Sequence, residues 1–253
     1  MAGRTEAKGG KYLYGIVLEP GERHYGFTGI NGAAVYTISN GRLAAVVSDF
    51  PNEKIRPERR HLAAQQAVLS GLLAQGETVL PMAFGIIASG PQAIKKILSG
   101  NQENFSKQLQ RVAGKVEMGL RVSLCVTNIF EYFVNAHPEL RAARDRLLGS
   151  YHTPTQEDKI ELGRLFDRIL NEDREHYTEQ VEEVLSDYCQ EIKRNKCRHE
   201  GEVMNLACLV WRQDQDRFEQ GVLEAAKLFD NNFTFDYNGP WAPHNFVEKS
   251  LNL

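Results

Sequence analysis

The sequence lacks a strong excess of either charge. Its 253 residues include 30 Lys and Arg against 33 Asp and Glu, which gives a formal net charge of −3. Proteins that bind nucleic acid concentrate cations on the phosphates, so this balance argues against a nucleic-acid partner. With 42% hydrophobic and 25% charged residues, the chain has the composition of an ordinary folded protein, long enough for one large or two modest domains.

Cysteine is scarce and scattered. The four cysteines are Cys125, Cys189, Cys197 and Cys208, and they form no CxxC pair. A zinc knuckle or a disulfide framework needs such paired spacing, so both are disfavoured. The run from Cys197 to Glu200 brings a thiol close to the His199 imidazole, but packing explains these residues better than metal binding. We expect reduced thiols in the cytoplasm and no metal site.

A long, uninterrupted hydrophobic run is also missing. One long uncharged stretch, Thr78 to Ile94, contains two prolines and two glycines. Because a bilayer core offers no water to satisfy a broken backbone, this stretch is a poor membrane span. The first residues, 1–11, contain no apolar region typical of a signal peptide. We therefore expect a cytoplasmic protein with no membrane association.

No motif for catalysis or cofactor binding stands out. The glycines of Gly26 to Gly32 match neither GxGxxG nor a P-loop, so we interpret this segment as a plain connecting loop. The sequence His176-Tyr-Thr-Glu179 lacks the second histidine of HExxH. The remaining histidines have no local link to a serine or cysteine nucleophile. We predict that the protein is not an enzyme and has no catalytic residues, cofactor site or metal site.

Hydrophobic periodicity in the first half predicts short strands mixed with helices. Strands are expected over 12–18 and, as a hairpin around Asn40-Gly41, over 33–39 and 43–48. A helix follows over 58–75, where Gln65 and Gln66 share the helical spacing of several leucines. Residues 79–88 predict an edge or bulged strand, since Pro81 lies within them. A helical region over 92–112 should break near Gly100-Asn101.

The second half begins with a strict alternation of apolar and polar residues over 115–127, which predicts a half-buried strand. Residues 128–148 look helical with an interruption at Pro138. Thr153 or Thr155 can then cap a long helix over 157–194, continuous or broken near 171–173. The apolar run 203–211 fits a strand buried on both faces. A helix over 217–229 and a final strand from Phe233 to Tyr237 complete the pattern.

These elements together predict an α+β protein. We expect two domains, each a mostly antiparallel, ferredoxin-like sheet with helices: residues 1–113 and residues 114–236. An extended C-terminal tail, residues 237–253, follows them.

The tail carries the most distinctive residues of the chain. Pro240 and Pro243 forbid a continuing helix, so Trp241 and Phe246 lie on a stiff, non-helical segment. These four residues either anchor the tail to its own protein or contact a partner, and physical reasoning leaves both open.

Three segments give the chain a resemblance to the gas vesicle GvpF/GvpL family, with GvpF the better fit. They are the opening Tyr12-Leu-Tyr-Gly-Ile-Val17, the central Val79-Leu-Pro-Met-Ala-Phe-Gly85 and the closing Tyr237-Asn-Gly-Pro-Trp-Ala-Pro-His-Asn-Phe-Val247. Their order and spacing run from one end of the chain to the other. The closing segment is the most specific of the three.

The resemblance implies a non-enzymatic accessory or minor structural protein that acts in gas vesicle assembly. Its implied partners are the small hydrophobic shell protein and other gas vesicle accessory proteins. An apolar surface would provide the contact, with help from the exposed side of the 157–194 helix. The alternative is a small-molecule-binding protein or an enzyme with a ligand crevice, because an α+β fold does not decide function.

Overall fold

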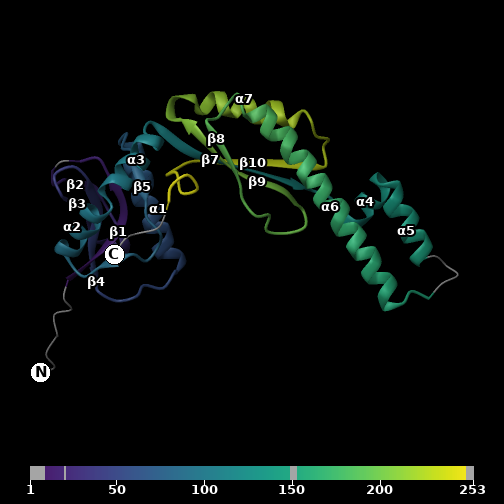
Figure 1. Cartoon of the computed structure of the whole chain (residues 1–253), viewed down its shortest axis with the longest axis horizontal. Coiled ribbons are helices and arrows are strands. Elements are labelled where there is room, and N and C mark those ends of the chain that lie inside the picture. The colour runs from purple at the N-terminus through teal and green to yellow at the C-terminus, as the bar shows by residue number, and fades with distance from the viewer. Residues whose placement is uncertain (1–8, 20, 149–152, 249–253) are drawn as a thin grey trace, which may run out of the picture. The chain divides into compact units, whose positions relative to one another are not determined.

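The computed structural model describes residues 9–19, 21–148 and 153–248 (Figure 1). By their internal contacts they fall into a first unit, Met1–Glu117 with Gly239–Leu253, and a second unit, Met118–Asn238. Each unit has one β-sheet with helices packed against it, so the predicted α+β class is confirmed. No helix within the described ranges combines the length and apolar character that crossing a bilayer requires.

The first unit contains a six-stranded sheet and three α-helices. The strands are β1 (Gly9–Val17), β2 (His24–Thr28), β3 (Ala34–Ser39), β4 (Ala44–Pro51), β5 (Val79–Pro81) and β6 (Ile87–Ala88). The helices are α1 (Arg59–Ala74), α2 (Pro91–Gly100) and α3 (Gln102–Val112). The strand order is β2-β3-β4-β1-β5, and β6 also pairs with β1. The pairs β1–β4, β1–β5, β1–β6, β2–β3 and β3–β4 are antiparallel.

Strand β1 forms the centre of this sheet. Every residue from Tyr12 to Val17 is buried. Because neighbouring side chains on a strand point to opposite faces, continuous burial means that both faces are covered here. Helix α1 contacts β1, β2 and β5, whereas α2 contacts β3, β4 and β6.

Most elements predicted for the first unit are confirmed. Asn40-Gly41 turns the β3–β4 hairpin, with Gly41 at φ 95°. Residues 79–88 form the edge pieces β5 and β6, and α2 gives way to α3 at Gly100-Asn101. The plain loop predicted over 26–32 is wrong in part, because Gly26 to Thr28 belong to β2 and pair with β3. A ferredoxin-like strand order is not found in this unit, because β1 passes to β2 without an intervening helix.

The second unit is built around a four-stranded sheet, of which residues 115–117 of one strand and 239–241 of another are assigned to the first unit. Its strands are β7 (Lys115–Leu124), β8 (Glu191–Arg194), β9 (Glu202–Trp211) and β10 (Phe233–Trp241). Its helices are α4 (Ile129–Ala136), α5 (Pro138–Leu148), α6 (Gln156–Leu185) and α7 (Gln215–Ala226). The strand order β10-β7-β9-β8, with helices after β7 and β9, matches the predicted ferredoxin-like arrangement.

Helices α6 and α7 contact each other and strand β9 (Figure 1). Strand β9 lies between β7 and β8, and Val203 to Val210 are buried except for the half-buried Asn205. The predicted strand with two covered faces is therefore confirmed. The prediction of a cap at the start of α6 is also confirmed: Thr155 and Asp158 form a reciprocal capping box.

The long helix predicted over 157–194 is wrong at its C-terminal end. Helix α6 runs unbroken through 171–173 and stops at Leu185. Residues 191–194 instead form β8, whose register pairs Ile192 with Cys208 of β9. The apolar Tyr188 and Ile192 continue the helical spacing by coincidence, and pairing with a buried strand overrides that local pattern.

The predicted tail does not begin as a separate segment. Its first residues, 237–241, complete strand β10. Pro240 is exposed at the end of this strand, which is where a residue without an N–H donor is tolerated.

Candidate functional site

The opening and central segments lie side by side in the first unit. Gly15, Ile16 and Val17 of β1 pair with Pro81, Leu80 and Val79 of β5. A Cβ atom at Gly15 would lie 2.6 Å from Val79 Cγ2 and 2.9 Å from the Leu80 carbonyl oxygen. Glycine at this position therefore lets the two strands approach closely.

A buried hydrogen-bond network fixes the loop that follows β5. Tyr12 Oη donates to Gln65 Oε1 of α1 (2.6 Å) and accepts from the Gly85 N–H (3.0 Å). Gln65 Nε2 donates to the Met82 carbonyl oxygen (3.0 Å). Burial raises the pKa of Tyr12 to about 12, so this hydroxyl stays protonated at neutral pH. The network ties β1, α1 and residues 82–85 into one rigid arrangement.

Tyr14 makes a second buried link. Its hydroxyl is 2.8 Å from Ser48 Oγ of β4 and accepts a hydrogen bond from the Ile30 N–H, also at 2.8 Å. Its carbonyl oxygen accepts from the Met82 N–H (2.9 Å). Both tyrosines of the opening segment thus position the central segment through polar contacts.

The closing segment belongs to the same unit. The Asn245 backbone N–H and side-chain amide donate to the two carboxylate oxygens of Glu117, at 2.8 Å and 2.7 Å. The Glu248 N–H donates to Gln108 Oε1 (2.7 Å). Of the predicted tail residues, Phe246 and Pro243 are buried, Trp241 is half-buried and Pro240 is exposed. The structure therefore places Pro243 and Phe246 inside the fold and leaves part of Trp241 accessible.

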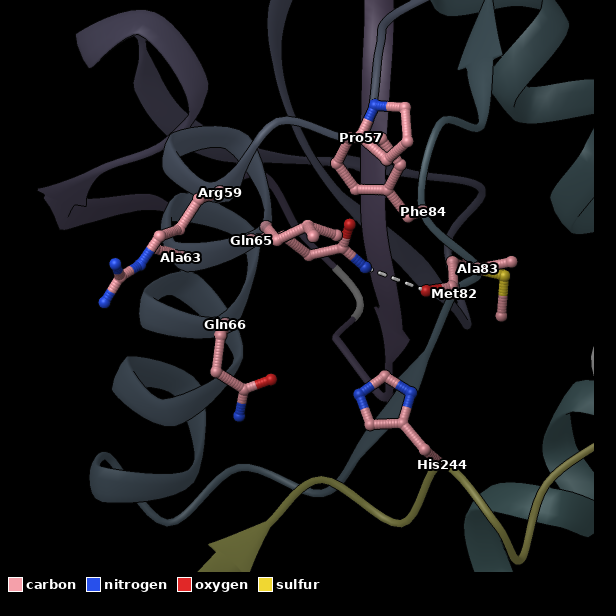
Figure 2. A pocket seen from close by; sticks show the side chains of 10 residues that line it. Pro57, Arg59, Ala63, Gln65, Gln66, Met82, Ala83, Phe84 and His244 are labelled. Atoms are coloured by element: carbon pink, nitrogen blue, oxygen red, sulfur yellow. Dashed lines mark hydrogen bonds between the residues drawn. The ribbon is translucent and has the colours of Figure 1, made fainter. Parts of the chain in front are cut away.

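An open groove lies between α1 and residues of the central and closing segments. It has a volume of about 810 Å³ and is shown in Figure 2. One wall is the N-terminal half of α1, and the opposite side is formed by Met82 to Phe84 together with His244 of the closing segment. The lining residues are Pro57, Arg59, Leu62, Ala63, Gln65, Gln66, Met82, Ala83, Phe84 and His244.

The groove offers an accessible apolar surface with few charges. Leu62 is 45% exposed and adds apolar area to the surface of the groove. Arg59 is exposed and makes no ion pair with a described residue. Gln66 Nε2 is buried without a hydrogen-bond partner among the described residues. The lining contains no carboxylate, thiol or hydroxyl, so it suits binding through shape and apolar contact.

The residues considered for metal or thiol chemistry lie elsewhere. Cys189 follows α6 and is buried, Cys208 is buried in β9, Cys197 is half-buried and Cys125 is exposed. Within the described ranges, no group of three or more His, Cys, Asp and Glu side chains is arranged to hold a metal ion. Cys197 and His199 therefore gain no further ligand from the fold.

Sequence reasoning did not foresee the groove, because its walls come from residues 57–66, 82–84 and 244. One signal was available. Gln65 and Gln66 occupy the apolar register of α1, and a glutamine there indicates either a buried hydrogen bond or a polar site. Gln65 makes a buried hydrogen bond to the Met82 carbonyl, and Gln66 lines the groove.

Comparisons with known proteins support the family resemblance, over a range that contains all three segments. A family model described as gas vesicle synthesis protein GvpL/GvpF matches residues 10–248. Gas vesicle protein F of Nostoc sp. is 24% identical over 95% of this chain and 99% of that protein. The Streptomyces sp. protein of the same name is 28% identical over 94% of this chain and 99% of its own length.

Solved structures show the same fold. The crystal structure of GvpF from Anabaena sp. PCC7120 superimposes with a TM-score of 0.82 at 23% identity, covering 96% of this chain and 99% of that one. GvpF from Microcystis aeruginosa gives a TM-score of 0.79 at 21% identity over 94% and 99% of the two chains. Since the family model spans nearly the whole sequence, the chain belongs to the gas vesicle synthesis protein GvpL/GvpF family.

Proposed function

We propose that this protein is a non-enzymatic accessory or minor structural component of gas vesicle assembly, and that it associates in the cytoplasm with the small hydrophobic shell protein. One observation carries the proposal: the central and closing segments of the family resemblance line an open groove with exposed apolar side chains, and the opening segment fixes the central one by strand pairing and a buried hydrogen bond. Other gas vesicle accessory proteins are further partners under the same proposal.

The groove supports this role better than the exposed side of α6. That helix presents mainly charged side chains, several joined in ion pairs, which water already solvates well. A specific protein interface buries roughly 800 Å² per partner, so a partner would have to cover the groove and its surroundings. Exposed Leu62 and half-buried Phe84 provide apolar area for such a contact.

The enzyme or small-molecule alternative has less support. Arg59 and His244 are the titratable side chains among the described residues that line the groove, and that lining includes no Asp or Glu. Calorimetric titration of the purified protein with ATP, GTP and zinc tests this directly. Stoichiometric binding of any of them at micromolar affinity would overturn the non-enzymatic role.

Co-expression with the shell protein tests the association. We expect the shell protein to co-purify with the tagged full-length chain at low and moderate salt, and the chain to float with buoyant vesicles from lysed cells. Failure of the shell protein to co-purify under any of these conditions would contradict the proposed partner while leaving the family membership intact.

A further inference from the structure

The groove between α1 and Met82–Phe84 is comparable in volume to a short helical segment. A cylinder of about 10 Å diameter and about 11 Å length, the envelope of two helical turns, occupies roughly 850 Å³. The groove volume is about 810 Å³. The groove is open to solvent, so such a segment can enter laterally.

An added β-strand does not fit the same place. Strand addition needs unpaired backbone groups along an edge. Here the Met82 N–H already donates to the Tyr14 carbonyl, and the Met82 carbonyl accepts from Gln65 Nε2. The Gly85 N–H donates to Tyr12 Oη. The wall is therefore recognised through side chains, as in complexes where an amphipathic helix lays its apolar face into a groove.

Positive charge at the Arg59 end of the groove favours a bound helix whose polar face carries carboxylates. Arg59 lies at the outer side of α1 in Figure 2 and has no ion pair with a described residue. It is also the first residue of α1, where the unpaired amides of a helix start add positive potential. Arg56 and Arg60 flank it in sequence, and only Glu58 offsets them locally. A carboxylate on the incoming segment complements this end of the groove.

We infer that the groove binds an amphipathic α-helix of the partner, with apolar side chains against Leu62 and Phe84 and a carboxylate beside Arg59. The inference rests on the proposed function, since it specifies how the same surface holds its gas vesicle partner. The expected occupant is a helix and not a strand, and its polar face is acidic and not basic.

Two alanines on α1 provide a matched pair for the test. Ala63 lines the groove, whereas Ala74, the exposed last residue of α1, does not. Ala63→Trp fills the groove, and Ala74→Trp adds the same bulk at the far end of the helix. Because both positions are exposed, both variants should keep the melting temperature of the parent. Arg59→Glu and Arg56→Glu form a second pair with identical net charge, of which only Arg59 lines the groove.

The probes are two synthetic stapled helices with the same leucine stripe, one flanked by glutamate and the other by lysine. We expect the full-length protein to prefer the glutamate helix by about tenfold in fluorescence polarisation. Ala63→Trp should weaken binding by at least about tenfold and Ala74→Trp by less than about twofold. Arg59→Glu should reverse the charge preference, whereas Arg56→Glu should only reduce it.

Three results would overturn the inference: no binding of either helix, equal binding by the parent and Ala63→Trp, or self-association of the parent that Ala63→Trp abolishes. The last result would make a second copy the occupant. Co-purification separates the two proposals. If the shell protein co-purifies equally with the parent and with Ala63→Trp, the groove is not the binding site, but the proposed function stands. If the synthetic helix binds and the shell protein does not co-purify, the shell protein is not the partner.

Discussion

The first unit keeps several polar contacts in its interior, whereas α6 of the second unit carries ion pairs on its surface. Tyr12, Tyr14 and Gln65 join strands and a loop through buried hydrogen bonds. Arg168 and Arg194 join α6 to α5 and β8 through side chains that remain largely exposed. A buried group that loses its partner pays its full desolvation cost, while water screens an exposed pair. Polar residues of the first unit should therefore affect stability more.

The two tryptophans allow this comparison to be measured unit by unit. Trp241 belongs to the first unit and Trp211 to the second, and the chain has no others. In a Trp211→Phe background, Trp241 is the fluorescent reporter of the first unit. In a Trp241→Phe background, Trp211 is the fluorescent reporter of the second unit. Separate reporters are needed because a two-unit protein does not have to unfold in one transition.

The largest effect is expected at the closing segment of the first unit. Phe246 is 1% exposed, and Phe246→Ala should cost about 3–5 kcal/mol through lost burial and a residual cavity. Trp241→Ala should cost less, because Trp241 is only half-buried. Denaturant unfolding followed by circular dichroism measures both. Equal losses would show that Trp241 anchors the segment as firmly as Phe246, and a Trp241→Ala variant that melts like the parent yet loses the shell protein would make Trp241 a partner contact.

Removing one buried hydroxyl should have the next largest effect. Tyr12→Phe leaves Gln65 Oε1 without its donor and the Gly85 N–H without its acceptor. We expect a loss of about 1–3 kcal/mol in the unfolding free energy, followed by Trp241 fluorescence. The control is Tyr188→Phe in the second unit, whose hydroxyl donates to Glu224 at the surface. It should leave the transition unchanged, and a similar loss in both variants would contradict the comparison.

Elements with a long local pattern were predictable from the sequence. The alternation over 115–127 identified β7, the continuous apolar run identified β9, and Thr155 marked the start of α6. In these places side-chain period and tertiary burial agree. Strand β8 was missed because its four residues sit at a sheet edge and continue the apparent helical spacing of α6.

The groove had no comparable local signal. His244 lies 160 residues beyond Phe84 in the sequence, and only the folded chain brings both to one cavity. The hydrogen bond from Gln65 to the Met82 carbonyl likewise joins elements whose pairing no periodicity encodes. The three family segments could be recognised as motifs in the sequence, but how they pack in the first unit depends on long-range contacts.

Alkaline pH should weaken the first unit through Tyr25. Burial, aided by the nearby negative Glu77, raises the pKa of Tyr25 to about 12, and its hydroxyl has no hydrogen-bond partner among the described residues. A raised folded-state pKa gives stability that is complete below about pH 10 and is lost as the pH rises toward about 12. At pH 11 the loss from this residue should be about 1.4 kcal/mol.

Tyr25→Phe checks the alkaline effect, because phenylalanine keeps the ring and removes the titrating group. The variant should be at least as stable as the parent at pH 8 and should lose less stability between pH 8 and pH 11. An identical loss in parent and variant would assign the alkaline sensitivity to other groups, such as Tyr12, whose pKa burial also raises to about 12.

The smallest effect is expected at the surface of the second unit, at Arg194. Its guanidinium contacts Glu182 (2.6 Å) and Glu175 (2.5 Å) of α6, and these carboxylates raise its pKa. The Arg194 side chain is nevertheless 40% exposed, so water and salt screen both pairs. Arg194→Gln should therefore cost less than about 1 kcal/mol at low ionic strength, followed by Trp211 fluorescence.

Salt dependence distinguishes this ion-pair contribution from a packing effect. The difference between parent and Arg194→Gln should shrink as ionic strength rises to about 1 M, where the screening length falls to about 3 Å. The neighbouring Lys193→Gln is the matched control, because its pair with Glu191 spans 4.0 Å and both side chains are partly exposed. The contrast between the two units would fail if Arg194→Gln lowered the unfolding free energy as much as Tyr12→Phe and the loss did not change with salt. The surface ion pairs of α6 would then stabilise the protein as much as the buried network does.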